Sequence, residues 1–466
     1  MMCGIRKDSG SMKVGLLPLY ISQYDKTSPH LRERMGVFYE KIAVMLEERG
    51  VKVVRSPICT EEEQFEKEVA TYEESDCDAI VTLHLAYSPG LYSEQALKNT
   101  KLPVIVCDTT ETFDFSDEQL SSEVMYCHGI HGVMDMCNLL KKNGKPYAIA
   151  AGHFEKSDVI DRVVGFVKAA VAANSLRGSR VGAVGGFFPG MGDFRVSEEN
   201  MLKTFDVTVV HPEKGEFTAL AASVTEEEIA AEKARNEAEL TFLEEVDEAV
   251  YTNSVTADLT LKKWIQSKGL QAFTINFRDI EELPTMPFNG ICRSMSEGVG
   301  YAGEGDTLTA LFTGALLQSY ADTSFIEIFC PDWEHNTLFI SHFCEMNYAV
   351  ADKKPTAYTK KFTFSDRPDP IAASAAYKPG NGVFLNVYED ENGFNAFIAP
   401  VKVVQEKTAH FRKSIRGWLD FSRPISEVLE KISRCGATHH SIMVYDARPE
   451  EIEFFAASLG LKTYML

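Results

Sequence analysis

Apolar runs of strand length alternate with amphipathic helical patterns over the first third of the chain. The runs KVGLLPLY, VKVVRS and DAIVTLHL are separated by LRERMGVFYEKIAVMLEERG and EEEQFEKEVATYEE, in which apolar residues recur at helical spacing. The rhythm continues through LPVIVCDTT and PYAIAAGHF, with helices expected near 128–142 and 157–174. Strands that alternate with helices form parallel sheets. We therefore expect a doubly wound α/β domain over residues 12–176.

A second α/β domain is expected over residues 177–320. It opens with the strand pattern RVGAVGGFF and carries one long acidic helix over 225–250, where Thr225 and Glu228 fit a capping box. The segments LTLKKWIQSKG and LQAFTINF add a further helix and strand. The chain thus contains two successive α/β cycles.

The pattern changes after about residue 320. Strand-like runs separated by turn residues dominate, among them TSFIEIF, NTLFISHF, KFTFS and GVFLNVYEDENGFNAFIAPVKVVQ. A late helix, ISEVLEKISRCG, precedes the strand pattern HHSIMVY. These features predict an antiparallel sheet or barrel over residues 321–466. At the other end of the chain, residues 1–11 are interpreted as a flexible leader.

Composition excludes some classes of binding partner and indicates the cell compartment. The 466 residues contain 47 Lys plus Arg and 68 Asp plus Glu, a net charge of −21, so the average surface repels nucleic acid and anionic membranes. Ten cysteines lie scattered without a C-x-x-C pair, which is typical of reduced thiols in the cytoplasm. No apolar segment approaches the roughly 18 residues of a membrane span. We expect a cytoplasmic protein with neither a nucleic-acid nor a membrane partner.

A glutamate and a histidine on neighbouring predicted strands indicate a metal site. Glu327 lies within the apolar run TSFIEIFC, where an unpaired carboxylate would cost several kcal/mol and therefore requires a cation. A hairpin centred near Glu334 and His335 would place Glu327 opposite His342 on one face. Oxygen and nitrogen ligands together suit Mn²⁺, Co²⁺ or Zn²⁺. A structural hydrogen bond between the two side chains is the alternative.

Two further segments carry candidate ligands. Glu304 stands in GVGYAGEGDTLTALF, where flanking glycines let the backbone bend ahead of a helix that Asp306 is expected to cap. An ordinary acidic loop is the alternative there. His439 and His440 are adjacent at the head of a predicted strand, so their side chains should point to opposite faces. Only one of them is then expected to join a given site.

The motifs GYAGEGD, TSFIE, SHFCEM and GATHH, in this order and at these separations, resemble the L-arabinose isomerase family. The resemblance implies two metal-binding glutamates and two metal-binding histidines, at Glu304, Glu327, His342 and His440. It also implies two Rossmann-like domains followed by a C-terminal β-barrel domain, in a homo-trimer or homo-hexamer. By the same resemblance HGIHGVMD supplies a histidine, His131, to a neighbouring subunit's site, although His128 lies close to it.

By resemblance the activity is that of a metal-dependent aldose–ketose isomerase working through an enediol. The expected cofactor is Mn²⁺, with Co²⁺ or Mg²⁺ possible, and Glu304 and Glu327 are the expected catalytic carboxylates. Proton transfer is favoured over a hydride shift because two carboxylates are present. We expect His131, His439 and Met191 to contact a small-molecule sugar substrate such as L-arabinose.

Departures from the family pattern bear on the sugar. LPLYISQYD replaces the family's N-terminal substrate-contacting pattern, Thr307 replaces an aromatic residue, and NYAV follows SHFCEM. L-fucose or another pentose or 6-deoxyhexose is therefore an alternative substrate, and a sugar-binding protein without turnover is an alternative class. The glycines of VGAVGGFFPGMGD fit neither G-x-G-x-x-G nor a phosphate loop, which argues against a nucleotide-dependent enzyme.

Overall fold

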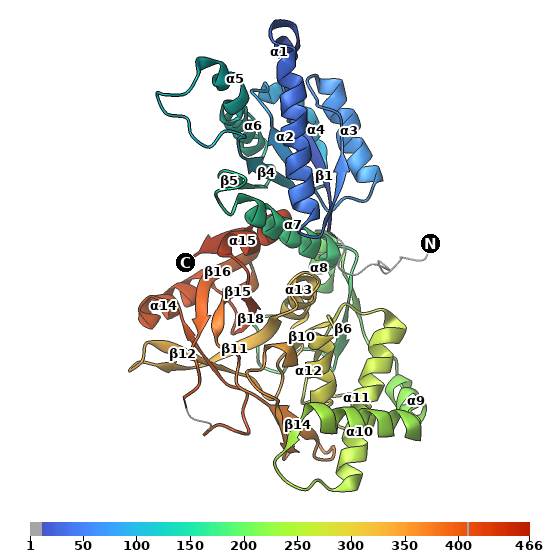
Figure 1. Cartoon of the computed structure of the whole chain (residues 1–466). Coiled ribbons are helices and arrows are strands. Elements are labelled where there is room, and N and C mark those ends of the chain that lie inside the picture. The colour runs from blue at the N-terminus through green and yellow to red at the C-terminus, as the bar shows by residue number, and fades with distance from the viewer. Residues whose placement is uncertain (1–11, 408–409) are drawn as a thin grey trace. The chain divides into compact units, whose positions relative to one another are not determined.

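The computed structural model describes residues 12–407 and 410–466 (Figure 1), so the expected leader over 1–11 lies outside the described residues. The chain divides into two compact units, with the boundary between Asn174 and Ser175. The finer division at residues 176 and 320 stays a prediction. Each unit is built around its own sheets and core.

Five parallel strands form the sheet of the N-terminal unit in the order β2-β1-β3-β4-β5. They are β1 (Met12–Leu19), β2 (Val51–Arg55), β3 (Ala79–His84), β4 (Val104–Asp108) and β5 (Tyr147–Ala151). The chain passes outward from β1 to β2 and then back beyond β1 to β3. With right-handed crossovers, this reversal places helices on both faces of the sheet, so the expected doubly wound architecture is confirmed.

The helices of this unit flank the sheet (Figure 1). They are α1 (Ser22–Thr27), α2 (His30–Glu47), α3 (Glu62–Glu74), α4 (Gly90–Asn99), a short 3₁₀ turn (Ser121–Glu123), α5 (Val124–Cys127), α6 (Gly129–Lys142) and α7 (Val159–Leu176). Helices α3, α4 and α6 bury their apolar stripes against one face of the strands. Tyr72 of α3 packs so closely over Gly15 of β1 that a Cβ there would lie 2.2 Å from the ring.

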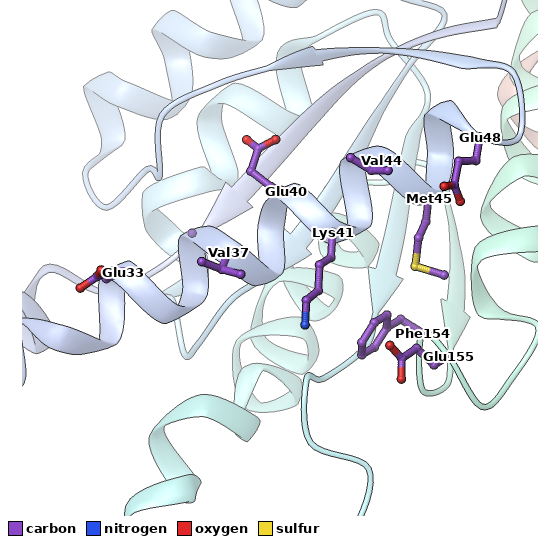
Figure 2. Close-up of a pocket in the computed structure, with 10 residues that line it drawn as sticks. Glu33, Val37, Glu40, Lys41, Val44, Met45, Glu48, Phe154 and Glu155 are labelled. Carbon is purple, nitrogen blue, oxygen red and sulfur yellow. The ribbon is translucent and has the colours of Figure 1, made fainter.

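A hollow of about 740 Å³ runs along the outer face of α2. Figure 2 shows Lys41 and Met45 pointing from the helix toward Phe154 and Glu155, which line the other side of the hollow. None of the ten lining residues, all of which the structure describes, is a predicted site residue. The predicted catalytic and metal-binding residues therefore lie elsewhere in the structure.

The second unit opens with a four-stranded parallel sheet in the order β10-β9-β6-β7. Its strands are β6 (Arg180–Val184), β7 (Thr208–Val210), β9 (Ala272–Ile275) and β10 (Gly300–Gly303). Its helices are α8 (Glu198–Phe205), α9 (Glu216–Ala222), α10 (Glu226–Glu239), α11 (Glu248–Lys268), α12 (Phe288–Ser296) and α13 (Thr307–Leu317). The capping box of Thr225 and Glu228 starts α10 as expected.

The prediction of one helix over 225–250 is wrong. Helix α10 ends at Glu239, and the short strand β8 (Thr241–Phe242) follows it. The backbone N–H of Thr241 donates to the carbonyl of Pro355, which pulls this segment into a small sheet with β13 and β14. Asp247 then caps a new helix, α11, through the backbone N–H groups of Ala249 and Val250.

A closed antiparallel barrel forms the end of the second unit. Six strands close in the order β15-β18-β11-β12-β17-β16, because β16 also pairs with β15. They are β11 (Thr323–Asp332), β12 (Thr337–Ser341), β15 (Gly380–Asp390), β16 (Gly393–Val403), β17 (Gly417–Asp420) and β18 (His440–Tyr445). Buried side chains such as Leu338, Phe384 and Met443 form its core. The expected C-terminal β-barrel is confirmed.

The remaining elements lie around the barrel. They are a 3₁₀ turn (Tyr348–Val350), β13 (Thr356–Thr359), β14 (Ile371–Ser374), α14 (Ile425–Cys435), α15 (Pro449–Ser458) and β19 (Lys462–Met465). Strand β19 adds to β16 in parallel. The predicted strand KFTFS is wrong, because pairing with β14 ends at Thr359.

Nine cysteines lie within the described residues, and all nine are free thiols. Burial raises the pKa of Cys107 to about 12, so this thiol is unreactive. Within 12–407 and 410–466, no helix combines the length and the apolar character that crossing a bilayer requires.

Candidate metal centre

The four predicted ligands converge in the second unit. Glu304 follows β10, Glu327 lies within β11, His342 follows β12, and His440 begins β18. Together with His439, they form two groups of three residues, and the ligand atoms within each group lie within 4.8 Å of one another. One group is Glu327, His342 and His440, and the other is Glu304, His440 and His439. His440 is common to both groups and therefore joins them into one cluster.

The register of the β11–β12 hairpin differs from the prediction. Asp332 pairs with Thr337 as expected, but a bulge between Ile328 and Cys330 shifts the register by one residue. Glu327 consequently pairs with Ser341 rather than with His342. A bulge of this kind re-aims the side chains beside it. His342, one residue beyond the strand, still places its Nε2 atom 3.7 Å from Glu327 Oε2.

A backbone bend aims Glu304 at the histidines. Its φ of 65° lies in the left-handed region, as does the 94° of Gly305. Glycine is required at 305, because a Cβ there would lie 2.4 Å from the carbonyl oxygen of Gly186. The backbone N–H of Phe188 donates to the Glu304 carbonyl at 2.9 Å and holds the bend.

His342 is anchored by a carboxylate behind it. Its Nδ1 atom bonds the carboxylate of Glu345, which also accepts a 2.8 Å hydrogen bond from the hydroxyl of Tyr301. Burial lowers the pKa of His342, but the carboxylates of Glu345, Glu327 and Glu304 together raise it by more, so the net direction is upward. A proton held on Nδ1 leaves the Nε2 lone pair directed at Glu327, the arrangement usual for a metal-ligating histidine.

His440 has an equivalent anchor. Its Nδ1 lies 3.0 Å from Asp306 Oδ2, and its Nε2 lies 3.5 Å from Glu304 Oε2. Asp306 also caps α13 as expected, since its other oxygen accepts from the backbone N–H of Thr309. The same aspartate therefore fixes the start of a helix and the orientation of a candidate ligand.

The expectation that His439 and His440 point to opposite faces is wrong. Strand β18 begins at His440, so His439 lies before the strand and escapes its alternation. Its Nε2 lies 3.4 Å from Glu304 Oε2, while its Nδ1 bonds Asp193 at 2.7 Å. Burial lowers the pKa of His439, but Asp193 and Glu304 raise it to about 10. Both histidines thus approach the same carboxylate oxygen.

The two glutamates have opposite environments. Burial raises the pKa of each carboxyl, but contacts with His439 and His440 outweigh it at Glu304 and bring that pKa well below its usual range. At Glu327 burial prevails over the opposing effect of His342, His440 and His439, and the pKa is raised. Divergent environments of this kind are typical of functional carboxylate pairs.

The cluster fits a divalent cation. His440 Nε2 is buried and has no hydrogen-bond partner among the described residues, although nearly all buried polar atoms have one. Two carboxylates and two imidazoles suit Mn²⁺ or Co²⁺, and the anchored Nδ1 atoms leave both Nε2 atoms free to coordinate.

Sequence reasoning missed three supporting residues: Glu345, Tyr301 and Asp193. Glu345 follows His342 by three residues within the motif SHFCEM, so the sequence did contain a signal that could have identified it. Asp193 meets His439 only through folding. The predicted contact residue Met191 lies half-buried in the same β6–α8 loop as Asp193. His131 lies exposed on α6 in the N-terminal unit, its ring 4.8 Å from that of Tyr87.

Comparison with known proteins relates most of the chain to one family. The model of the L-arabinose isomerase central domain matches residues 192–319, and that of the L-arabinose isomerase C-terminal domain matches residues 322–462. Together they span more than half of the chain. An L-arabinose isomerase of Shouchella clausii is 22% identical over 462 residues, which cover 97% of this chain and 93% of the relative.

Other similarities are partial. L-arabinose isomerase 2 of Bacillus licheniformis is 25% identical over 60% of this chain and 64% of its own length. Among solved structures, a periplasmic solute-binding protein from Actinobacillus succinogenes with bound D-allose is 14% identical, covering 66% of this chain and 91% of its own. Its TM-score is only 0.17, so this similarity says nothing about the fold or function of the chain. From the two matched domains and the full-length relatives, we conclude that the chain belongs to the L-arabinose isomerase family and is an enzyme of the isomerase class.

Proposed function

We propose that this protein is a metal-dependent aldose–ketose isomerase that interconverts an aldose such as L-arabinose with its ketose through an enediol intermediate. The observation that carries the proposal is the pair of imidazoles whose Nδ1 atoms are held by carboxylates, Asp306 and Glu345, and whose Nε2 atoms face Glu304 and Glu327. Such anchoring fixes ligands before they bind.

Glu304, Glu327, His342 and His440 hold the cation in this proposal, with Mn²⁺ as the native metal and Co²⁺ or Mg²⁺ as alternatives. The bound cation supplies polarisation of the sugar's carbonyl oxygen. The buried position of His342 and His440, at 6% and 0% exposure, excludes water from the ligand side of the site.

Glu304 and Glu327 also move the protons. Conversion of an aldose to its ketose moves a proton from C2 to C1 and a hydroxyl proton from O2 to O1, and two positioned carboxylates can share these transfers. Glu304 lies in the bend after β10 and Glu327 lies within β11, so the two carboxylates can contact different atoms of one substrate. His439 and Met191 are the proposed substrate contacts from this unit.

The double change Glu304→Gln with Glu327→Gln tests these roles. Glutamine has the size of glutamate but cannot accept the proton, so we expect ketose formation to fall below detection while circular dichroism is unchanged. Glu334→Gln, an exposed carboxylate on the β11–β12 turn, is the matched control and should retain full activity. Appreciable turnover by the double variant would contradict the proposed roles.

We further propose a cytoplasmic homo-trimer or homo-hexamer in which His131 reaches the substrate of a neighbouring subunit. Support comes from the family resemblance and, for the compartment, from the described free thiols. Light scattering of the purified protein gives the mass. Mixing inactive His131→Ala protein with the inactive Glu304→Gln protein should restore part of the activity if subunits share sites.

A further inference from the structure

Three basic side chains stand over aromatic rings beside the candidate metal centre. Arg278 lies 5.5 Å above the ring of Phe188, and Lys360 lies 4.1 Å above that of Phe343. Arg195 lies 5.7 Å from the ring of Phe187 and donates to the Phe188 carbonyl at 3.3 Å. Cation–π contacts hold long side chains in place without neutralising their charge.

The rings form one continuous aromatic wall, which we define as Phe188, Phe277, Phe343 and Phe364. Phe277 lies 5.2 Å from Phe188 and 5.3 Å from Phe343. Phe364 lies 5.0 Å from both Phe277 and Phe343 and is 41% exposed. Arg278 and Lys360 are therefore attached to two rings of a single surface.

This wall is joined to the metal centre at both ends. Phe188 is hydrogen-bonded through its backbone to Glu304, and Phe343 directly follows His342. Arg195 directly follows Phe194, whose ring stacks on that of His440 at 5.0 Å. Each of the three cations is thus linked to the cluster of proposed ligands through a residue that it contacts or directly follows.

The charges of these cations are not neutralised within the chain. Among the described residues, no carboxylate lies within ion-pair distance of Arg195, Arg278 or Lys360, whereas many other arginines have such partners. Examples are Arg34 with Glu111 and Glu123, Arg55 with Glu40 and Glu47, and Arg416 with Glu406. In a chain of net charge −21, three unpaired cations around one site are unexpected for a neutral ligand.

We propose that Arg195, Arg278 and Lys360 select a sugar with an anionic substituent, either a phosphate ester or a carboxylate. The inference rests on the proposed function and names the substrate class of the same site. A neutral sugar leaves the three charges uncompensated, whereas an anion remote from the reacting carbons gains charge-assisted hydrogen bonds. The aromatic wall is then the surface along which the anion reaches the cations.

Equilibrium binding tests this without requiring turnover. Calorimetry on Mn²⁺-loaded protein compares D-arabinose 5-phosphate with D-arabinose, and D-galacturonate with D-galactose. We expect at least one anionic sugar to bind about tenfold or more tightly than its neutral counterpart, since hydrogen bonds between charged groups are stronger than those between neutral groups. The pair that shows the preference distinguishes phosphate from carboxylate. Equal or weaker binding of both anionic sugars, or no detectable binding of either, overturns the proposal.

Variants locate the preference. Arg278→Gln with Lys360→Gln should bring the anionic-to-neutral affinity ratio close to one, and Lys360→Arg should retain it. Arg434→Gln with Lys402→Gln removes two exposed charges elsewhere and should leave the ratio unchanged. A ratio that survives the first double change overturns the proposal. Efficient metal-dependent turnover of neutral sugars without any anionic preference would sink this inference alone, whereas failure to bind Mn²⁺ would sink the proposed function.

Discussion

Glu327 on β11 lies directly opposite His440 on β18 in the antiparallel register of the barrel. Directly opposed residues have neighbouring Cβ atoms, so the backbone pairing itself brings this carboxylate and this imidazole together. His342 reaches the same glutamate from the other side, through β12. Three adjacent strands therefore assemble much of the centre, and rigid strands position ligands more precisely than loops do.

Loss of the anchor behind His440 should weaken metal binding without unfolding α13. Asn at 306 can still cap the helix but cannot hold Nδ1 as a carboxylate does, so we expect Asp306→Asn to lower Mn²⁺ affinity by about 10–100-fold. Competition with a fluorescent chelator measures the affinity. Asp247→Asn alters the N-cap of α11 without touching a histidine and should bind Mn²⁺ normally. Unchanged affinity in Asp306→Asn would show that the anchor has no role.

A methyl group at position 303 should displace His342. A Cβ on Gly303 would lie 2.7 Å from the imidazole Cε1 atom, closer than such contacts normally allow. We expect Gly303→Ala to lower Mn²⁺ affinity by roughly tenfold or more, the scale on which displaced ligand geometry acts. Gly36→Ala is the control, because a Cβ there meets nothing within 4 Å. Equal metal affinity in the two variants would mean that His342 does not bind the metal.

Stability should fall with rising pH because of Asp258 on α11. Burial raises its pKa to about 8, although its Oδ1 accepts a 2.8 Å hydrogen bond from the Gly290 backbone. The folded state thus binds this proton more tightly than the unfolded chain, whose aspartates titrate near 4. The stabilisation is complete below about pH 4 and declines toward pH 8, by roughly 1.4 kcal/mol per pH unit.

Asp258→Asn should remove that pH dependence, since the amide is neutral and can still accept from Gly290. Urea unfolding at pH 5.5 and 7.5 gives the free energy of unfolding for both proteins. The loss on raising the pH should be clearly smaller in the variant than in the parent. Identical losses would place the pKa of Asp258 outside this window.

Local patterns in the sequence were sufficient for most of the order of elements, and the family resemblance pointed to the glutamates and histidines that the fold brings together. Alternating runs predicted the parallel sheets and the barrel, and an isolated glutamate in an apolar strand pointed to a cation. Where local pattern and long-range pairing disagree, the prediction failed. The helix expected over 225–250 is interrupted because Thr241 pairs with Pro355, a contact that no periodicity reveals.

The details of the site depended on backbone irregularities. The bulge beside Phe329 changed the partner of Glu327, and the start of β18 at His440 brought His439 to the same carboxylate. Neither irregularity carries a clear signal in residue type. The anchor Asp306 was recognised only as a helix cap, since nothing in the sequence relates it to His440.

Metal-stripped protein provides the most direct test of the central claim. Interconversion of aldose and ketose is assayed with and without added Mn²⁺ on L-arabinose, L-fucose, D-galactose, L-ribulose and D-arabinose, together with D-arabinose 5-phosphate and D-galacturonate. We expect turnover of at least one of these sugars to disappear on stripping and to return with Mn²⁺. Stoichiometric Mn²⁺ binding without turnover of any of them, or turnover that is indifferent to stripping, would contradict a metal-dependent isomerase.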